Sequence, residues 1–78
     1  MLRIKPEVDL KELKKFGFVD YDKSFYRFDK LNRNECIWVN KLSRLIEIET
    51  FSIILGAIVN ESLSKVYELI EAGLVEKN

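Results

Sequence analysis

Residues Val8–Phe18 read VDLKELKKFGF, and this stretch predicts a short helix whose beginning and end are both specified. Asp9 suits the N-cap position, and Glu12, three residues later, completes a capping box that satisfies free backbone N–H groups. Val8 before the cap and Leu13 within the helix form a hydrophobic staple across this start. The helix is therefore expected to span about residues 10–16.

The end of this helix is marked by Gly17, a residue that adopts the left-handed backbone conformation without steric cost. Phe18 can then fold back onto Leu13, as a Schellman ending requires. One side of the helix is apolar and the opposite side is basic. The apolar residues are Leu10, Leu13 and Phe16, and the basic residues are Lys11, Lys14 and Lys15.

After this helix the apolar pattern changes to the two-residue period of β-strands. Strands are predicted at Phe25–Asp29, Glu35–Val39 and Leu45–Thr50, and Phe18–Val19 begins a short fourth one. Turn-forming residues separate these segments, and such short connections require antiparallel neighbours. We therefore expect an antiparallel meander of three to four strands.

Alternation within the predicted strands assigns their side chains to two faces of the sheet. The last strand alternates most cleanly, with Ile46 and Ile48 on one face and Glu47 and Glu49 on the other. In the two earlier strands, the pairs that share a face are Phe25 with Arg27, Tyr26 with Phe28, Cys36 with Trp38, and Ile37 with Val39.

A second helix is predicted at about residues 61–72, with Asn60 or Ser62 as its N-cap. Its ending, Ala72-Gly73-Leu74, repeats the stop signal of the first helix, with Leu74 able to contact Leu69. Apolar residues recur at helical spacing and form a stripe along it. The stripe consists of Leu63, Val66, Tyr67, Ile70 and Leu74.

Together these elements predict one small α+β domain over residues 1–78. It comprises an N-terminal helix, the three- to four-stranded antiparallel meander and a C-terminal helix, with the helices packed on one sheet face. Leu2–Lys5 is expected to form an extended arm or edge strand, and Val75–Asn78 a tail that frays. The predicted core consists of Leu10, Leu13, Phe16, Phe28, Trp38, Ile46, Ile48, Val66 and Ile70.

The chain has one cysteine and no histidine. Cys36 therefore cannot form a disulfide within the chain, and it is interpreted as a small buried apolar residue. Because no apolar run has the length of a membrane span and no signal peptide is visible, we expect a cytoplasmic protein that does not enter the membrane. A chain of 78 residues builds only a modest core, so contact with a partner is an expected source of stability.

A catalytic role is not expected, because the common nucleophilic triads and dyads require histidine. Glu47 and Glu49 share a strand face and can form a carboxylate pair, but a solvent-facing role is the simpler interpretation. Asp20 and Asp22 imitate the start of a calcium loop, although the glycine and glutamate that such a loop requires are missing. No catalytic, cofactor-binding or metal-ligating residue is predicted, and no cofactor.

Nucleic-acid binding is an alternative that rests on the distribution of charge. Residues 1–44 carry eleven basic and seven acidic residues, whereas residues 45–78 carry two and six, so the net charge is zero. The candidate contacts are Lys11, Lys14 and Lys15 on the first helix, and the aromatic residues around Arg27 are suited to stacking on bases. The simpler interpretation makes these lysines a solvent-exposed helix face and the aromatic residues part of the core.

Protein–protein contact is the favoured hypothesis, with either a second copy of this chain or an unidentified protein as the partner. The segment 51–59 is more apolar than a surface connection requires, and it fits a buried strand, the entry to a helix or an exposed interface. Self-association through this segment or through a sheet edge is expected. The candidate interface residues are Phe51, Ile53, Ile54, Leu55 and Ile58.

Two segments resemble small uncharacterised proteins from phages and prophages of Gram-positive bacteria. The first is IKPEVDLKELKKFGF, residues 4–18, and the second is VYELIEAGLVEK, residues 66–77. The resemblance implies a short intracellular accessory protein of a mobile element, and it carries no activity, ligand or functional residue with it. An inhibitor of a host protein is a further alternative, since this is a common kind of small phage protein.

Overall fold

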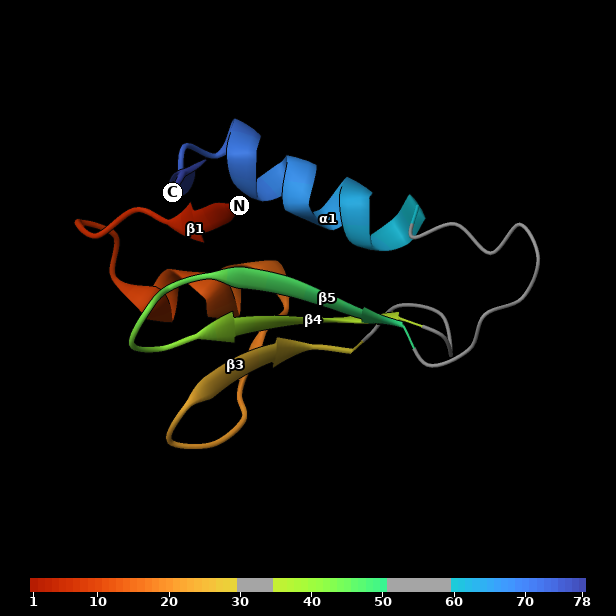
Figure 1. Ribbon diagram of the computed structural model, residues 1–78, viewed down its shortest axis with the longest axis horizontal. Coiled ribbons are helices and arrows are strands. Elements are labelled where there is room, and N and C mark those ends of the chain that lie inside the picture. The colour runs from red at the N-terminus through yellow and green to blue at the C-terminus, as the bar shows by residue number, and fades with distance from the viewer. Residues whose placement is uncertain (30–34, 51–59) are drawn as a thin grey trace.

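The computed structural model describes residues 1–29, 35–50 and 60–78, which form an α+β fold with antiparallel strands and two helices (Figure 1). This fold class agrees with the prediction. In chain order the elements are β1 (Leu2–Ile4), η1 (Leu10–Phe16), β2 (Val19–Asp20), β3 (Phe25–Phe28), β4 (Glu35–Asn40), β5 (Ile46–Thr50), α1 (Asn60–Glu71) and β6 (Val75–Lys77).

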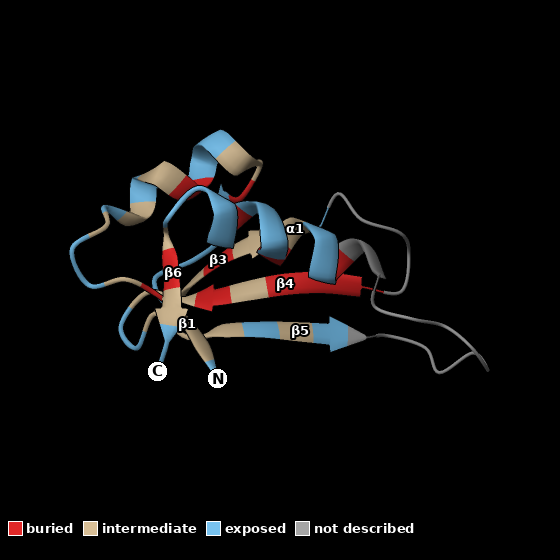
Figure 2. Ribbon diagram, turned by 90° about the horizontal axis from the view of Figure 1, so that it is seen from above, coloured by how far each residue is buried: buried red, intermediate tan, exposed pale blue. Residues whose placement is uncertain are grey.

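Strands β2, β3, β4 and β5 form one antiparallel sheet in the order of the chain. The central strand β4 is the most deeply buried, and β5 lies at an edge of the sheet (Figure 2). In the β3–β4–β5 register Phe28 lies opposite Ile37, which lies opposite Ile48. The four-stranded sheet therefore presents one continuous row of apolar side chains to the interior.

The N-terminal helix has the predicted bounds, but it is a 3₁₀ helix. Asp9 and Gly17 cap it as expected, because the Asp9 side chain accepts a hydrogen bond from the Lys11 N–H and Gly17 adopts φ 92°. The Glu12 carboxylate, which was expected to complete a capping box, pairs with Lys15 instead. The Phe18 N–H closes the ending on the Leu13 carbonyl, at 3.2 Å. With seven residues between two fixed caps, the segment uses the tighter i→i+3 pattern that is frequent in short helices.

The C-terminal residues do not fray, contrary to expectation. They form β6, which pairs antiparallel with β1, so the two ends of the chain lie side by side (Figure 1). Gly73, at φ 79°, turns the chain back after α1 and lets the Leu74 carbonyl accept a hydrogen bond from Lys5. The guanidinium of Arg3 pairs with the Glu76 carboxylate at 2.6 Å. The sequence patterns do not reveal this two-stranded sheet, because its pairing joins the two extremes of the chain.

The core combines the inward face of the four-stranded sheet with residues of both helices and of the β1–β6 pair. Leu13, Phe28 and Val66 are buried as predicted, and Leu10, Phe16, Ile46 and Ile48 pack against them while partly exposed. The buried apolar cluster is Ile4, Leu13, Phe18, Tyr26, Phe28, Ile37, Val39, Val66, Leu69 and Val75.

Two predicted core residues are wrong. Trp38 lies on the opposite face of β4 from Ile37 and Val39, both of which are fully buried. Both faces of β4 are apolar in sequence, so alternation alone does not show which face turns inward. Ile70 is 41% exposed, whereas its neighbour Leu69 is fully buried. The contact face of α1 is therefore rotated from the predicted stripe, and Leu63 and Tyr67 are exposed with Ile70.

A buried carboxylate holds the start of α1. Glu35, at the beginning of β4, is 4% exposed, and its Oε1 accepts a hydrogen bond from the Ser62 backbone N–H at 3.3 Å. A negative charge at a helix N-terminus is stabilised by the free N–H groups of the first turn. Glu35 therefore serves as a cap from a distant strand.

Several predictions fall outside the described residues. These are the turn expected between the predicted strands Phe25–Asp29 and Glu35–Val39, and the candidate interface residues Phe51, Ile53, Ile54, Leu55 and Ile58. Within the described part of the chain, no helix has the length and apolar character needed to cross a bilayer.

Candidate functional site

The face of the four-stranded sheet that points away from the core, here called the outer face, carries the most distinctive cluster of side chains. Arg27 on β3 lies opposite Trp38 on β4, and Trp38 lies opposite Glu47 on β5. A cation, an indole ring and a carboxylate thus form one row across three strands. Arg27 and Trp38 alternate with buried residues of their own strands, and Glu47 alternates with Ile46 and Ile48, which pack against the core while partly exposed. This alternation orients all three side chains away from the core.

Three aromatic rings meet on this outer face around Trp38. The Tyr21 ring lies 5.1 Å from the Trp38 ring and the Phe25 ring 5.2 Å from it, both in edge-to-face geometry. The Arg27 guanidinium lies 4.9 Å from the Trp38 centroid and 5.4 Å from the Tyr21 centroid. These distances are typical of aromatic pairs and of cation–π contacts, so the cluster is a packed unit rather than loose surface side chains.

Glu49 connects this aromatic cluster to the edge strand. Its Oε1 accepts a hydrogen bond from Nε1 of Trp38 at 3.2 Å and one from Sγ of Cys36 at 3.6 Å. Cys36 is fully buried, as expected, and this burial raises the pKa of its thiol. The nearby Arg27 guanidinium opposes the rise and the Glu49 carboxylate adds to it, so the thiol pKa stays above its ordinary value. The thiol therefore stays protonated at neutral pH. The two hydrogen bonds that Glu49 accepts fix its carboxylate beside the indole ring.

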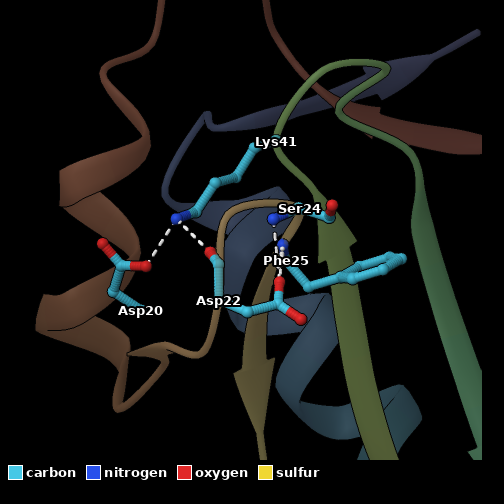
Figure 3. Close-up of polar contacts among 5 residues, drawn as sticks. All are labelled: Asp20, Asp22, Ser24, Phe25 and Lys41. Atoms are coloured by element: carbon cyan, nitrogen blue, oxygen red, sulfur yellow. Dashed lines mark hydrogen bonds and ion pairs between the residues drawn. The ribbon is translucent and has the colours of Figure 1, made fainter.

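The turn between β2 and β3 positions Tyr21 and Phe25. The Asp22 carboxylate accepts hydrogen bonds from the backbone N–H groups of Ser24 and Phe25, each at 2.8 Å (Figure 3). This local pattern, in which an aspartate side chain closes its own turn, explains why the sequence turns here. The Asp22 carboxylate is therefore committed to the turn.

Lys41 anchors the same turn from the far end of β4. Its ammonium group pairs with the Asp20 carboxylate and donates to the Asp22 backbone carbonyl, as Figure 3 shows. The backbone N–H of Lys41 also donates to the Ser24 carbonyl at 2.8 Å. The loop that carries Tyr21 and Phe25 is thus held at both of its ends.

The outer face is hollowed beside these rings. A groove of about 600 Å³, called the aromatic groove, is lined by Tyr21, Asp22, Phe25, Trp38, Glu47, Ile48 and Glu49. Its lining combines three aromatic side chains with three acidic ones, which are here called the acidic rim, and Arg27 is not among its lining residues. A groove of this composition is suited to holding a side chain of a partner rather than to performing a reaction.

The lysines predicted as nucleic-acid contacts are exposed on η1. Lys15 pairs with Glu12 at 2.9 Å, and this hydrogen bond and charge raise the pKa of Lys15. Among the described residues, Lys11 and Lys14 have no carboxylate within 4.0 Å. Two of the predicted contacts are therefore unpaired cations.

These lysines do not share a surface with the aromatic groove. Leu13 of η1 belongs to the same buried cluster as Phe28 and Ile37, so η1 packs on the inward face of the sheet. Trp38 and its neighbours project from the opposite face. The basic helix surface and the aromatic residues that sequence reasoning combined are thus separated by the sheet.

The sequence patterns did not predict the aromatic groove, because they placed Trp38 in the core and gave no role to Tyr21, which lies between two predicted strands. The shared face of Phe25 and Arg27, and that of Cys36 and Trp38, was predicted and is observed. Combined with the strand register, these pairs would have placed the aromatic side chains beside Glu47 and Glu49 on one surface.

The described residues contain no group of three or more histidine, cysteine, aspartate or glutamate side chains placed to hold a metal ion. A scan against family models and searches of curated proteins and of solved structures gave no match to this chain.

Proposed function

We propose that this chain is a non-enzymatic protein-interaction domain and that it contacts its partner through the aromatic groove. The observation that carries the proposal is the groove itself, where three aromatic side chains line about 600 Å³ of the outer face. Tyr21 is 51% exposed, although large aromatic side chains are stabilised by burial. Aromatic residues gathered in a surface pocket are typical of the energetic centre of a protein interface.

The position of the groove in the fold supports this proposal. Both helices contribute to the core on the inward face, through Leu13 of η1 and through Val66 and Leu69 of α1. Among the described residues, neither helix covers Trp38 and its neighbours. The rings are held rigidly by the anchored turn and by Glu49, and a rigid surface loses little conformational entropy on binding.

Nucleic-acid binding is the weaker alternative on electrostatic grounds. A base-stacking surface needs basic side chains around its rings to hold the phosphates. The rim of the aromatic groove carries Asp22, Glu47 and Glu49 instead. Lys11 and Lys14, which have no carboxylate partner among the described residues, lie on η1, on the other side of the sheet.

Self-association is a second part of the proposal, and its candidate contact residues lie outside the described ranges. The small core favours a partner that buries further apolar surface, and the segment 51–59 supplies apolar residues for such a contact. Light scattering behind a sizing column tests this directly. A mass that rises with protein concentration is the expected result, and a monomer at the highest concentration would remove self-association from the account.

The biological setting that we propose is an accessory protein of a phage or prophage, with a host protein as the heterologous partner. The experiment is capture from a Gram-positive lysate by the immobilised protein, followed by affinity measurement with the purified captured protein. The variant Tyr21→Ser/Phe25→Ser is expected to weaken binding roughly tenfold or more, because it removes two walls of the groove.

The matched control is Tyr67→Ser, which removes an exposed ring from α1, where Tyr67 is 62% exposed. This variant is expected to bind as the unmodified protein does. Circular dichroism checks that every variant is folded. If no protein is retained, or if the double variant and the control bind equally well, the aromatic groove is not the contact surface and the proposal is wrong.

A further inference from the structure

The charges that line the aromatic groove are all of one sign. Of its seven lining residues three are acidic, Asp22, Glu47 and Glu49, and none is basic. Among the described residues, no lysine or arginine lies within 4.0 Å of the carboxylates of Glu47 or Glu49. Both carboxylates stand on the edge strand beside the rings, so their charge is available to a molecule that enters the groove.

Two aromatic rings of the groove already contact a cation within the protein itself. The guanidinium of Arg27 stacks on Trp38 and Tyr21 at centroid distances of 4.9 and 5.4 Å. This contact arises because the face of an aromatic ring carries negative electrostatic potential. Arg27 contacts two of the lining rings but is not itself a lining residue, so the charged side chains that line the groove are all carboxylates.

We propose that the aromatic groove binds a lysine or arginine side chain from a basic segment of a partner protein. The apolar stem of that side chain packs against Phe25 and Trp38, while its charged end reaches the carboxylates of Glu47 and Glu49. The hydrogen bond from Trp38 fixes Glu49 beside the ring, so little reorganisation is needed on binding. This inference rests on the proposed function and adds the chemistry of the partner.

Two other occupants fit the groove less well. A second copy that docks with its own outer face brings Glu47 and Glu49 toward the same carboxylates, and like charges in contact oppose association. A nucleic acid brings phosphates, which the acidic rim repels for the same reason. The favoured occupant is therefore a cationic peptide segment.

The test uses the fluorescence of Trp38, the only tryptophan of the chain, during titration with a tetra-arginine peptide. A tetra-citrulline peptide of the same shape but without charge is the matched ligand. The arginine peptide is expected to shift the emission in a saturable way that weakens with added salt. The citrulline peptide is expected to bind roughly tenfold or more weakly, since it lacks the charge-assisted contacts.

The protein variant Glu47→Gln/Glu49→Gln is expected to weaken arginine-peptide binding by a similar factor. Glutamine at position 49 keeps an acceptor for Trp38, so the groove itself is preserved. The control Glu7→Gln/Glu71→Gln makes the same change in net charge at two exposed positions outside the groove and is expected to bind within about twofold of the unmodified protein. Equal weakening in both variants would show nonspecific attraction and overturn the proposal.

Other outcomes also overturn it. A shift of the emission with protein concentration alone would assign the groove to a second copy, and a shift with oligothymidylate would assign it to nucleic acid. Absence of any arginine-peptide effect would make the partner chemistry wrong. If binding of the captured protein were still weakened by the Tyr21→Ser/Phe25→Ser variant, the proposed function would stand without this partner chemistry. If that variant also had no effect, both the proposed function and this inference would be wrong.

Discussion

Nε1 of Trp38 donates a hydrogen bond to Oε1 of Glu49 across a distance of 3.2 Å, which joins the central aromatic ring of the outer face to a carboxylate of the edge strand. The same oxygen accepts from Sγ of Cys36. The ring and the carboxylate therefore hold each other in position, and the acidic rim is part of the aromatic cluster. The surface combines an apolar wall with an oriented negative charge, and this combination carries the functional proposal.

Two glycines with left-handed backbones provide a matched test of the fold. A Cβ at Gly17 would lie 2.7 Å from Cε2 of Phe28, whereas a Cβ at Gly73 would meet no atom within 4 Å. Gly73→Ala is expected to lower the unfolding free energy by about 1–2 kcal/mol, the usual cost of the left-handed conformation. Gly17→Ala adds overpacking against Phe28, and it is expected to cost roughly 1–3 kcal/mol more.

Urea denaturation of both variants measures this difference. Equal destabilisation would show that Phe28 yields to the added methyl group, and it would contradict the close packing of η1 on the sheet.

The orientation of α1 gives a second pair of variants. Leu69 is fully buried and Ile70 is 41% exposed. Leu69→Ala is expected to lower the unfolding free energy by roughly 2–5 kcal/mol, because it leaves a cavity in the core. Ile70→Ala is expected to cost less than about 1 kcal/mol. Thermal or urea unfolding measures both losses. A larger loss for Ile70→Ala than for Leu69→Ala would show that the helix packs with the face predicted from the apolar periodicity.

This pair also shows why sequence patterns reached only part of the fold. Capping signals gave the bounds of η1 and the ending of α1, because these depend on neighbouring residues. The inward face of α1 was assigned only in part, because the exposed residues Leu63, Tyr67 and Ile70 are as apolar as the buried residues Val66 and Leu69. Which stripe packs on the sheet depends on contacts with β6 and with β4, and β4 is far from α1 in the chain.

The candidate site was less accessible to sequence reasoning than the fold. The shared faces of the strands were predicted correctly, including the face that holds Glu47 and Glu49. Trp38 was nevertheless assigned to the core, because a large aromatic residue in a short chain is expected to be buried. Tyr21 joins the cluster only through the β2–β3 turn, whose position depends on the distant Lys41.

Lys41 is therefore expected to matter for the aromatic cluster as well as for the turn. Lys41→Met removes the ion pair with Asp20 and the hydrogen bond to the Asp22 carbonyl. We expect a loss of about 1 kcal/mol in stability and a red shift of Trp38 emission as Tyr21 moves away. The control is Lys23→Met, an exposed residue in the same turn. An identical emission change in both variants would refute the anchoring role.

The raised pKa of Cys36 predicts a pH dependence of stability. Because burial raises the thiol pKa in the folded state, the folded protein holds this proton more tightly than the unfolded chain does. The contribution is fully present below the ordinary thiol pKa of about 8.5 and declines as the pH rises from there toward the folded pKa. Cys36→Ala removes this titration.

The check is the difference in unfolding free energy between the unmodified protein and Cys36→Ala, measured from pH 7 upward. This comparison cancels the tyrosines and lysines that titrate in the same range. The difference is expected to shift in favour of the variant as the pH rises above about 8.5. A difference that stays constant with pH would show that the thiol is not held protonated by the fold.

The most direct measurement of the central claim is an ¹H–¹⁵N NMR titration of the labelled protein with the tetra-arginine peptide. The chain has one tryptophan, so the indole N–H of Trp38 gives a single signal at the centre of the outer face. The account predicts that this signal shifts most, together with the backbone amides of Tyr21, Phe25 and Glu47. An unmoved indole signal, with the largest shifts on η1 or α1, would contradict it.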